Sequence, residues 1–230
     1  MENQIYYSVI VPFYNEEDSV EELLGSLTSV MEKLGKPYEI LACDDGSTDH
    51  TRRENMKMSS VNPAIVPFGF RANRGQTACL AEGIKRAKGE VVISLDGDLQ
   101  DCPSDIPALL DEMEATGADA VCGWRKGRND ATGKTALSRL GNSLQRLLLN
   151  VPVHDISCTL RVYRAQAIKK IRLEQKGLHR YIPYLLQRAG FRLAEKEVNH
   201  KPRRYGSSKY SLRKAPQTVK LFFGLISGKY

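Results

Sequence analysis

The first half of the chain alternates apolar runs with segments in which apolar residues recur every three or four positions. The apolar runs predict β-strands at 5–13, 38–43, 64–68, 90–95 and 118–123. The periodic segments predict helices at 17–34, in a short stretch from Asp49, at 76–87 and at 106–115. Asn15 or Asp18 is expected to cap the first helix, and Gly35 to end it.

Strands that alternate with helices over short connections predict an α/β fold, a parallel sheet with helices on both faces. In open sheets of this kind the ligand lies at the carboxyl ends of the strands. Polar clusters at 12–16, 44–47, 73–76 and 96–100 lie at or near the ends of predicted strands. We therefore expect these clusters to converge at one edge of a Rossmann-like, mostly parallel sheet.

The second half of the chain is less regular. Its spacing predicts helices at 135–150 and 181–188 and strands at 158–163 and 191–198. Polar or basic loops are expected at 125–133 and 200–209. Because no internal repeat or low-complexity linker divides the sequence, we expect one main domain at 1–210 and a short tail at 211–230.

Two carboxylates flank a glycine directly after the predicted strand 90–95, in Asp96-Gly97-Asp98. Oxygen ligands in such a pair are typical of sites that hold Mg²⁺ or Mn²⁺ together with substrate phosphates. Asp-Gly is also common turn chemistry, so the triplet alone leaves a pair of turn aspartates as an even alternative. The other polar clusters favour the metal site, with the glycine as a flexible hinge.

The net charge of +7 is concentrated near the C-terminus. No Asp or Glu follows Glu197, whereas eight Lys or Arg residues do. Without these eight, the rest of the chain holds 26 of the 34 basic residues and all 27 acidic ones. A basic tail that also carries aliphatic and aromatic residues predicts an amphipathic segment on an anionic membrane surface. The alternative is a final helix packed on the core.

Cysteine usage and hydropathy indicate the compartment. The five cysteines are scattered, odd in number and without metal-binding spacing, which is typical of reduced thiols. No apolar run is long enough to cross a bilayer, and the first residues show no signal-peptide pattern. We expect a cytoplasmic protein that is peripheral at the cytoplasmic face of the membrane.

Four segments carry a resemblance to a known family. In chain order they are Val11-Pro12-Phe13-Tyr14-Asn15-Glu16, Asp44-Asp45-Gly46-Ser47-Thr48-Asp49, Asn73-Arg74-Gly75-Gln76 and Asp96-Gly97-Asp98-Leu99-Gln100. This ordered series resembles the signature of glycosyltransferase family 2, and the resemblance extends over Ser8 to Tyr210. It implies a GT-A type catalytic domain and a nucleotide-sugar donor.

A second set of residues narrows the resemblance to one branch. The set is Leu99-Gln100-Asp101, Arg125, Arg139 and Gly206-Ser207-Ser208-Lys209-Tyr210. It is similar to the transferases that act on polyprenyl phosphates such as dolichol phosphate and undecaprenyl phosphate. The resemblance implies inverting, metal-dependent transfer from a UDP- or GDP-sugar, with Mg²⁺ or Mn²⁺ as cofactor. Thr159 and Arg71-Ala72 depart from the family pattern. These departures leave the identity of the transferred sugar less defined than the reaction class.

The resemblance also implies roles on the donor side. The expected metal ligands are Asp96, Asp98 and Gln100. The expected nucleotide-sugar contacts are Pro12, Tyr14, Glu16, Asp44, Asp45, Asn73, Gly75, Gln76 and Asp96. Purely structural alternatives stay open: Gln100 as a solvated turn residue, Asp44 to Asp49 as helix capping, and Asn73 to Gln76 as a capped turn.

On the acceptor side the resemblance implies a set of phosphate-binding residues. They are Arg125, Arg139, Ser143, Arg203 and Lys209, and the expected catalytic residues are Asp98, Arg125 and Arg139. A lipid phosphate is anionic near neutral pH, so cations that hold two anionic substrates together matter more than a strong base. Arginine suits phosphate because it binds bidentately. For each single residue the alternative is a solvated basic surface.

Three other functions stay open at this point. A family 2 enzyme with a glycan or other hydroxyl acceptor would need a general base, which Asp101 or Asp155 could supply. A nucleic-acid-binding protein would fit the pI of about 9.1, but the basic residues are confined to the tail. A sugar nucleotidyltransferase is disfavoured because no Gly-rich, Lys-containing triphosphate loop occurs. We expect no nucleic-acid partner, and the oligomeric state is unknown.

Overall fold

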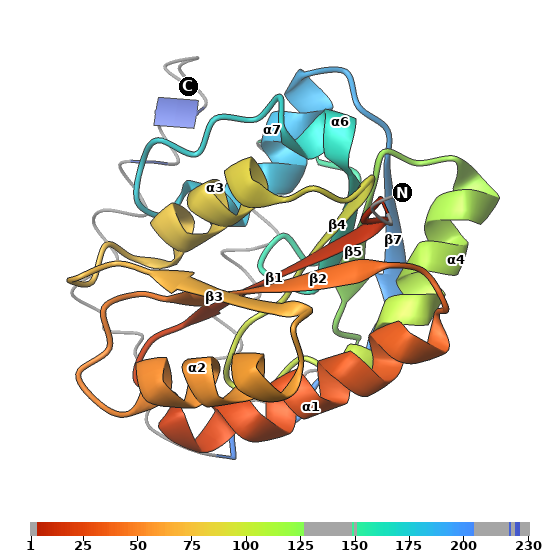
Figure 1. Cartoon of the computed structure of the whole chain (residues 1–230). Coiled ribbons are helices and arrows are strands. Elements are labelled where there is room, and N and C mark those ends of the chain that lie inside the picture. Colours follow the sequence, from red (N-terminus) through yellow and green to blue (C-terminus); the bar gives the residue numbers. More distant parts are fainter. Residues whose placement is uncertain (1–3, 127–148, 150, 205–220, 222–223, 226–230) are drawn as a thin grey trace.

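The computed structural model describes residues 4–126, 149, 151–204, 221 and 224–225. Within this part of the chain, seven strands form one sheet (Figure 1). They are β1 (Tyr7–Phe13), β2 (Tyr38–Asp44), β3 (Ile65–Gly69), β4 (Val91–Ser94), β5 (Ala120–Trp124), β6 (Arg161–Arg164) and β7 (Leu193–Glu197). Their order across the sheet is β3-β2-β1-β4-β6-β5-β7.

The sheet is mostly parallel, as the alternation of strands and helices predicts. The exception is β6, which runs antiparallel to both of its neighbours, β4 and β5. The strand expected at 158–163 is shorter than predicted and begins later, at Arg161. Its first residues lie in a turn instead, in which the Ser157 N–H donates to Asp155 Oδ1 (3.1 Å) and the Cys158 N–H to the Asp155 carbonyl (3.4 Å).

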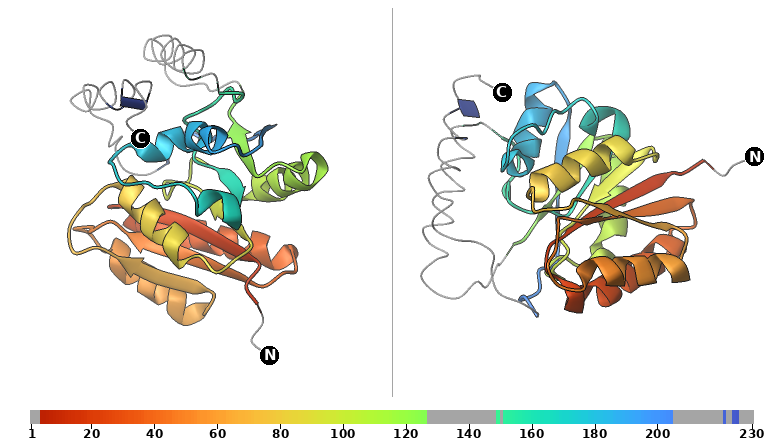
Figure 2. Two further views of the ribbon diagram at one scale, coloured as in Figure 1. Left: turned by 90° about the horizontal axis from the view of Figure 1, so that it is seen from above. Right: turned by 60° about the vertical axis from the view of Figure 1, so that its left-hand side comes forward.

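Helices cover both faces of the sheet. One face carries α1 (Glu17–Lys33), α2 (Thr51–Val61) and α4 (Ile106–Thr116), with the 3₁₀ turn η1 (Pro103–Asp105) before α4. The other carries α3 (Gln76–Arg86), α6 (Ala165–Ile168), the 3₁₀ turn η2 (Leu178–Tyr181) and α7 (Ile182–Arg188). The right-hand view of Figure 2 shows the sheet between these two helical layers.

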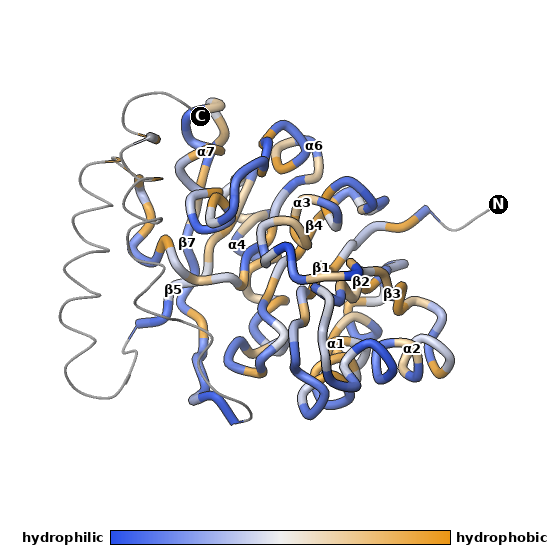
Figure 3. The backbone as a smooth tube through the Cα atoms, turned by 90° about the vertical axis from the view of Figure 1, so that its left-hand side faces the viewer, coloured by the Kyte–Doolittle hydropathy of each residue, from blue (hydrophilic) through white to orange (hydrophobic). Residues whose placement is uncertain are grey.

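The alternation of side chains along each strand divides the core into two clusters. In β1, Val9 and Val11 pack toward α1 and α4, whereas Ile10 packs toward α3. Because both faces are covered, the central strands are apolar on both sides. Figure 3 shows hydrophilic stretches of the chain mainly on the outward turns and loops. The core thereby fixes the strand ends that carry the polar clusters.

The start of α1 differs from the expectation. Neither Asn15 nor Asp18 caps it; the N–H groups of Glu16 and Glu17 donate to Thr51 Oγ1 (2.8 Å) and Asp49 Oδ2 (3.3 Å). Asn15 has instead a left-handed backbone (φ 48°), which turns the chain between β1 and α1. The end of α1 is as expected, since Gly35 follows it with φ 68°.

Most other element predictions are confirmed within a few residues, including the helices over 76–87 and 106–115. The helix expected at 135–150 lies almost entirely outside the described residues. Of the tail, Leu221 and Leu225 are described, and both are buried in the cluster that contains η2 and α7. The Tyr184 hydroxyl donates to the Leu225 carbonyl (3.2 Å). At these two positions the tail fits the alternative of packing on the core.

Candidate active site

The polar clusters converge at one edge of the sheet, as the sequence predicts. Three contacts join them: the Asn15 N–H donates to Ser47 Oγ (2.9 Å), the Gly75 N–H to Asp45 Oδ2 (2.9 Å), and the Gln76 amide to Asp96. Because β1, β2 and β4 are parallel, their carboxyl ends all deliver residues to this edge. The edge is therefore the candidate site.

The loop after β4 places three carboxylates close together. Asp98 and Asp101 are buried, 8% and 4% exposed, and Asp96 is half-buried. Leu99 has φ 61° and turns the loop, and the Gln100 N–H donates to Asp98 Oδ1 (3.2 Å). This tight turn keeps Asp96 and Asp98 at the sheet edge.

Gly97 is a packing requirement rather than the flexible hinge that the sequence suggests. A Cβ atom at this position would lie 2.6 Å from Phe13 Cδ1 and 2.8 Å from the Pro12 carbonyl oxygen. The end of β1 therefore leaves room only for glycine. The loop is held against β1 by this contact and by the Ser19 hydroxyl, which donates to the Gly97 carbonyl (2.6 Å). The two carboxylates have a fixed backbone between them.

Burial and neighbouring negative charge make Asp96 and Asp101 harder to ionise. Burial, followed by the negative charges of Asp98 and Asp101, raises the pKa of Asp96 to about 7. Burial also raises the pKa of Asp101, although the Thr159 hydroxyl and Arg125 act in the opposite direction. A divalent cation would stabilise the ionised forms of these groups, so the electrostatics of the loop fit a metal.

The oxygen ligands available in this loop also fit a hard cation that binds substrate phosphates at the same time. Among the described residues, no three His, Cys, Asp or Glu side chains are placed to hold one ion. Asp101 accepts a hydrogen bond from Thr159 Oγ1 (2.7 Å), so Asp96 and Asp98 stay the candidate carboxylate ligands. Mg²⁺ is commonly bound by one or two carboxylates, with substrate phosphates and waters completing the shell.

Gln100, the third expected ligand, contacts a later segment. Its Nε2 lies 3.5 Å from His200 Nε2 and 3.4 Å from the Lys201 carbonyl oxygen. The Lys201 N–H in turn donates to the Gln100 carbonyl (2.9 Å). The segment after β7 thus runs along the carboxylate loop and brings basic residues to it.

Arg203, from this same segment, lies against two of the expected donor-side carboxylates. Its NH2 group lies 2.5 Å from Asp98 Oδ2, and its NH1 group 3.4 Å from Glu16 Oε1. Glu16 and Asp98 come from different loops, so the guanidinium links the end of β1 to the carboxylate loop. A metal cation that binds Asp98 would compete with the Arg203 guanidinium for the same carboxylate oxygen.

The expected nucleotide contacts divide into two kinds. Asp45 is structural, because its carboxylate accepts hydrogen bonds from Asn73 Nδ2 (2.8 Å) and from the N–H groups of Arg74 (2.8 Å) and Gly75 (2.9 Å). These bonds hold the turn that begins α3. Asp44 caps its own turn through the Ser47 N–H (3.1 Å).

The remaining expected contacts lie in more open positions. Pro12 and Tyr14 are half-buried at the end of β1, and Glu16 is buried beside Arg203. Gln76 is the first residue of α3 and points its amide toward Asp96. Gly75 has φ 92°, and a Cβ there would lie 2.9 Å from Lys176 Cε, so this turn favours glycine. These residues border the carboxylate loop.

Arg125, expected to bind phosphate, already has a carboxylate partner. Its Nε lies 2.7 Å from Asp155 Oδ2 and its NH2 3.0 Å from Asp155 Oδ1, and NH2 also donates to Ser157 Oγ (2.8 Å). Burial acts to raise the pKa of Asp155, but the hydrogen bonds from Arg125 and Ser157 outweigh it and lower that pKa to about 2. Asp155 is therefore ionised and paired. Arg139, Ser143 and Lys209 lie outside the described residues.

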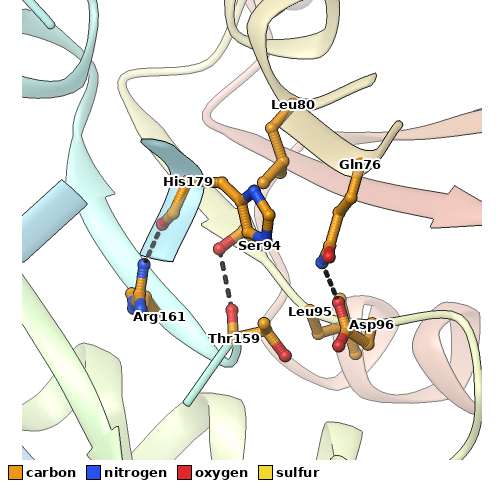
Figure 4. A pocket seen from close by; sticks show the side chains of 8 residues that line it. All are labelled: Gln76, Leu80, Ser94, Leu95, Asp96, Thr159, Arg161 and His179. Carbon is orange, nitrogen blue, oxygen red and sulfur yellow. Dashed lines mark hydrogen bonds between the residues drawn. The ribbon is translucent and has the colours of Figure 1, made fainter. Parts of the chain in front are cut away.

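A buried polar group near Asp96 lies outside the expected set of site residues. Figure 4 shows Thr159, Arg161 and His179 around a small pocket with Ser94 and Asp96. Burial, with the charges of Arg180 and Arg161, lowers the pKa of His179 to about 3, so its ring is neutral. The signal available was Arg161 itself, a charge inside an otherwise apolar run at 158–163.

None of the helices in the described ranges is both long enough and apolar enough to cross a bilayer.

Comparison with known proteins agrees with this geometry. The sequence matches the family "Glycosyl transferase family 2" over residues 8–172. It is 35% identical over 226 residues to dodecaprenyl-phosphate galacturonate synthase of Rhizobium johnstonii, covering 96% of this chain and 65% of that protein. It is 34% identical over 224 residues to undecaprenyl-phosphate 4-deoxy-4-formamido-L-arabinose transferase of Edwardsiella ictaluri, covering 96% and 67%. The chain thus spans about two thirds of the length of these curated relatives.

Solved structures share the fold at low sequence identity. Glucosyl-3-phosphoglycerate synthase from Mycobacterium tuberculosis, crystallised with Mn²⁺ and UDP-glucose, has a TM-score of 0.74 at 16% identity, covering 97% of this chain and 79% of that one. TarS (residues 1–349) from S. aureus, in complex with UDP-GlcNAc, has a TM-score of 0.63 at 21% identity, covering 95% and 65%. The mostly parallel sheet with helices on both faces is therefore a GT-A fold, and the chain belongs to glycosyl transferase family 2.

Proposed function

We propose that this chain transfers a sugar from a UDP- or GDP-sugar to a polyprenyl phosphate, in a metal-dependent reaction that inverts the anomeric carbon. The carboxylate loop Asp96–Asp101 at the carboxyl edge of the sheet carries the proposal, because it places two candidate metal ligands beside basic residues from later segments. The names of the two curated relatives support a polyprenyl-phosphate acceptor. The structural neighbours support a UDP-sugar donor with Mn²⁺.

On the donor side, Asp96 and Asp98 are the residues that would hold Mg²⁺ or Mn²⁺. The cation supplies Lewis-acid stabilisation of the departing nucleoside diphosphate. Pro12, Tyr14, Glu16 and Asp44 line the side expected for the nucleoside. Asp45 contributes indirectly, by holding the turn that contains Asn73 and Gly75.

On the acceptor side, an oxygen of the lipid phosphate attacks the anomeric carbon of the sugar. The bond between that carbon and the diphosphate breaks, and a sugar–phosphate ester bond forms with inverted configuration. The phosphate needs no deprotonation, so the protein mainly has to hold two anions together. Arg203 is the described cation nearest to the carboxylate loop, and Arg139, Ser143 and Lys209 stay expected contacts.

A hydroxyl acceptor fits the described residues less well, because it requires a general base. Of the two candidates, Asp155 is ion-paired with Arg125, and the pKa near 2 makes it a weak base. Burial raises the pKa of Asp101, which makes it the stronger base of the two, but at 4% exposed and bonded to Thr159 it is not open to a substrate hydroxyl. We therefore favour the phosphate acceptor.

A lipid acceptor requires access to a membrane surface. We propose peripheral association at the cytoplasmic face, with the basic segment after Glu197 near anionic headgroups. The tail at 211–230 is proposed as the membrane-proximal part, although Leu221 and Leu225 pack on the protein.

The test is a transfer assay with the purified chain, Mn²⁺ or Mg²⁺, a panel of UDP- and GDP-sugars and a short-chain polyprenyl phosphate. We expect a lipid-linked sugar by mass spectrometry with one donor, and its loss with Asp98→Asn. Transfer only to a hydroxyl acceptor would contradict the polyprenyl-phosphate proposal. Full activity of Asp98→Asn would contradict the metal role.

A further inference from the structure

A groove of about 530 Å³ lies between α3 and the segment that follows α6, on one helical layer of the molecule (Figure 1). Its floor is aliphatic, formed by Ala81 and Ile84 of α3 and by Ile171 and Leu173 of the later segment. Ile84 and Leu173 are 7% and 8% exposed and belong to the second core cluster. The floor is therefore part of the packed core.

The rim of this groove is basic. Lys85, Lys169 and Arg172 line it together with a single acidic residue, Glu174, and all four are exposed. Glu174 lies 3.8 Å from Arg172, but the two side chains are 73% and 88% exposed, so this pair contributes little. The rim thus presents three cations against one carboxylate.

Positive charge continues along the segment 169–176 beyond the groove. Lys170 and Lys176 are also exposed, and Glu174 is the only acidic residue between positions 169 and 176. This is a second concentration of positive charge, separate from the basic segment after Glu197. A basic surface of this kind attracts an anionic partner.

The two ends of the segment 169–176 lie at the two ends of α3. Lys169 Nζ donates to the carbonyl of Ala87, just after α3 (2.8 Å), whereas a Cβ at Gly75, just before α3, would lie 2.9 Å from Lys176 Cε. Because α3 has 11 residues, it is about 16 Å long. A single phosphate cannot contact cations this far apart, whereas a surface that carries many phosphates can.

This face of the molecule also joins the tail to the candidate active site. Gly177 ends the segment, and a Cβ there would lie 3.3 Å from Leu221 Cδ2 of the tail. The Gly177 N–H donates to Thr77 Oγ1 (2.8 Å), near the start of α3. Lys176 borders Gly75, which is one of the expected nucleotide-sugar contacts. A membrane on this side would therefore lie beside the active edge of the sheet.

We propose that α3 and the segment 169–176 dock on an anionic phospholipid surface, in addition to the basic segment after Glu197. The cations of the rim bind headgroup phosphates, and the aliphatic floor receives part of the apolar region of the lipid. The inference deepens the proposed function by naming the surface that meets the membrane, and its consequence for sugar transfer rests on that function. RNA also presents many phosphates, but single strands commonly stack on aromatic side chains, and none of the described lining residues is aromatic.

The test is co-sedimentation of the full chain with vesicles made of equal parts of phosphatidylcholine and phosphatidylglycerol. Each Lys or Arg near an anionic surface contributes about fivefold in affinity, so we expect Lys85→Gln/Arg172→Gln to bind about thirtyfold more weakly than the wild type. Lys33→Gln/Arg52→Gln is the matched control, because it removes the same charge from exposed positions of α1 and α2, on the opposite face of the sheet. We expect this control to bind nearly as well as the wild type.

Four outcomes overturn the docking proposal: no binding of the wild type to these vesicles, equal binding to phosphatidylcholine alone, equal loss in the two double variants, or binding to RNA but not to vesicles. Circular dichroism establishes that each variant is folded.

Transfer assays on the same variants separate this proposal from the proposed function. We expect Lys85→Gln/Arg172→Gln to transfer normally to a short-chain polyprenyl phosphate in detergent, and poorly to the same acceptor in anionic vesicles. If the wild type transfers no sugar but the double variant still loses vesicle binding, the docking surface stands and the proposed function fails.

Discussion

Asp98 is the carboxylate on which two positive charges converge. In the structure its Oδ2 contacts Arg203, and in the proposed reaction the same group holds a divalent cation. Arg203 also contacts Glu16, so the guanidinium is held from two loops. In the proposed reaction the cation and Arg203 therefore compete for Asp98.

Replacing Arg203 by Gln should tighten Mn²⁺ binding to the donor-free chain. The competing guanidinium is removed, and a hydrogen bond to a charged group contributes about 1.5 kcal/mol, which corresponds to roughly tenfold in affinity. Titration with Mn²⁺ by electron paramagnetic resonance measures this. Arg204→Gln is the control, because Arg204 pairs with the more exposed Glu22 (3.1 Å). Unchanged binding by Arg203→Gln would show that the contact with Asp98 does not compete with the metal.

The Arg125–Asp155 pair makes stability depend on pH. The pKa of Asp155 is near 2 in the fold, below its ordinary value of 3.8, so the ionised pair stabilises the fold above that value. The stabilisation is lost as the pH falls through the folded pKa. Between pH 3.8 and 2 we expect the free energy of unfolding to fall by about 2 kcal/mol from this pair.

Asp155→Asn tests the pair directly. The variant leaves Arg125, whose side chain is 8% exposed, without its carboxylate, which should cost about 3 kcal/mol at neutral pH. Urea unfolding across the acid range should show a smaller pH dependence than the wild type. Asp18→Asn, at an exposed position in α1, is the control. An equal pH dependence in Asp155→Asn and the wild type would exclude this pair as its source.

At this scale the sequence predicts residue types better than partners. Asp96 and Gln76 are brought together as expected, because both follow from strand ends at one edge. The pairing of Arg125 with Asp155 cannot be predicted from the sequence, because Asp155 lies in a turn 30 residues further along the chain. His179 is hidden, because a buried polar residue looks like a loop residue until its contacts are known, and Arg161 stands out only as a charge within a short run of mainly apolar residues.

Among the elements, α1 and α2 depend on each other at their N-termini. Thr51, the first residue of α2, is fully buried and accepts the Glu16 N–H, while Asp49 accepts the Glu17 N–H. An N-cap supplied by a distant segment cannot be read from local sequence, which is why the capping of α1 was predicted wrongly. It also ties the position of Glu16 to α2.

Thr51→Val should therefore destabilise the fold by about 1 kcal/mol, the usual contribution of a capping hydroxyl. The change keeps the shape and removes the acceptor for Glu16 N–H. Urea unfolding gives the difference. Ser60→Ala, at an exposed position of α2 where the hydroxyl donates to the Lys57 carbonyl, should change the stability much less. Equal effects of the two variants would contradict a special role for Thr51.

The predictability of the elements follows their periodicity. The strands and helices of the first half are apolar on defined faces, so their type and order emerge from spacing alone. The direction of β6 does not, because a short apolar run carries no information on whether it pairs parallel or antiparallel. Its shift to Arg161–Arg164 follows from the turn at Asp155–Cys158.

For the whole molecule, the buried tail residues link the C-terminus to the second core cluster. Leu225 is fully buried, and Leu221 is 5% exposed. A segment that the sequence assigns to a membrane surface thus contributes at least these two side chains to the protein core. Membrane contact, if the proposal holds, has to involve other residues of the basic segment.

Leu225→Ala should lower the free energy of unfolding by about 2–4 kcal/mol, as large-to-small substitutions in cores do. Chemical denaturation measures the loss. Val61→Ala, at a position that is 75% exposed, serves as the control and should change little. A neutral Leu225→Ala variant would contradict packing of this residue on the core.

The antiparallel direction of β6 has a consequence for how the two halves of the chain share one active edge. Because the chain reverses here, β6 begins at the edge where β1, β2 and β4 finish. Residues Asp155 to Arg161 are delivered there, and α6 is carried to the opposite edge. Had β6 run parallel, the same sequence would have left Thr159 and Arg161 far from Asp96. The reversed strand therefore adds Thr159 and Arg161 to an edge that the segment after β7 also reaches.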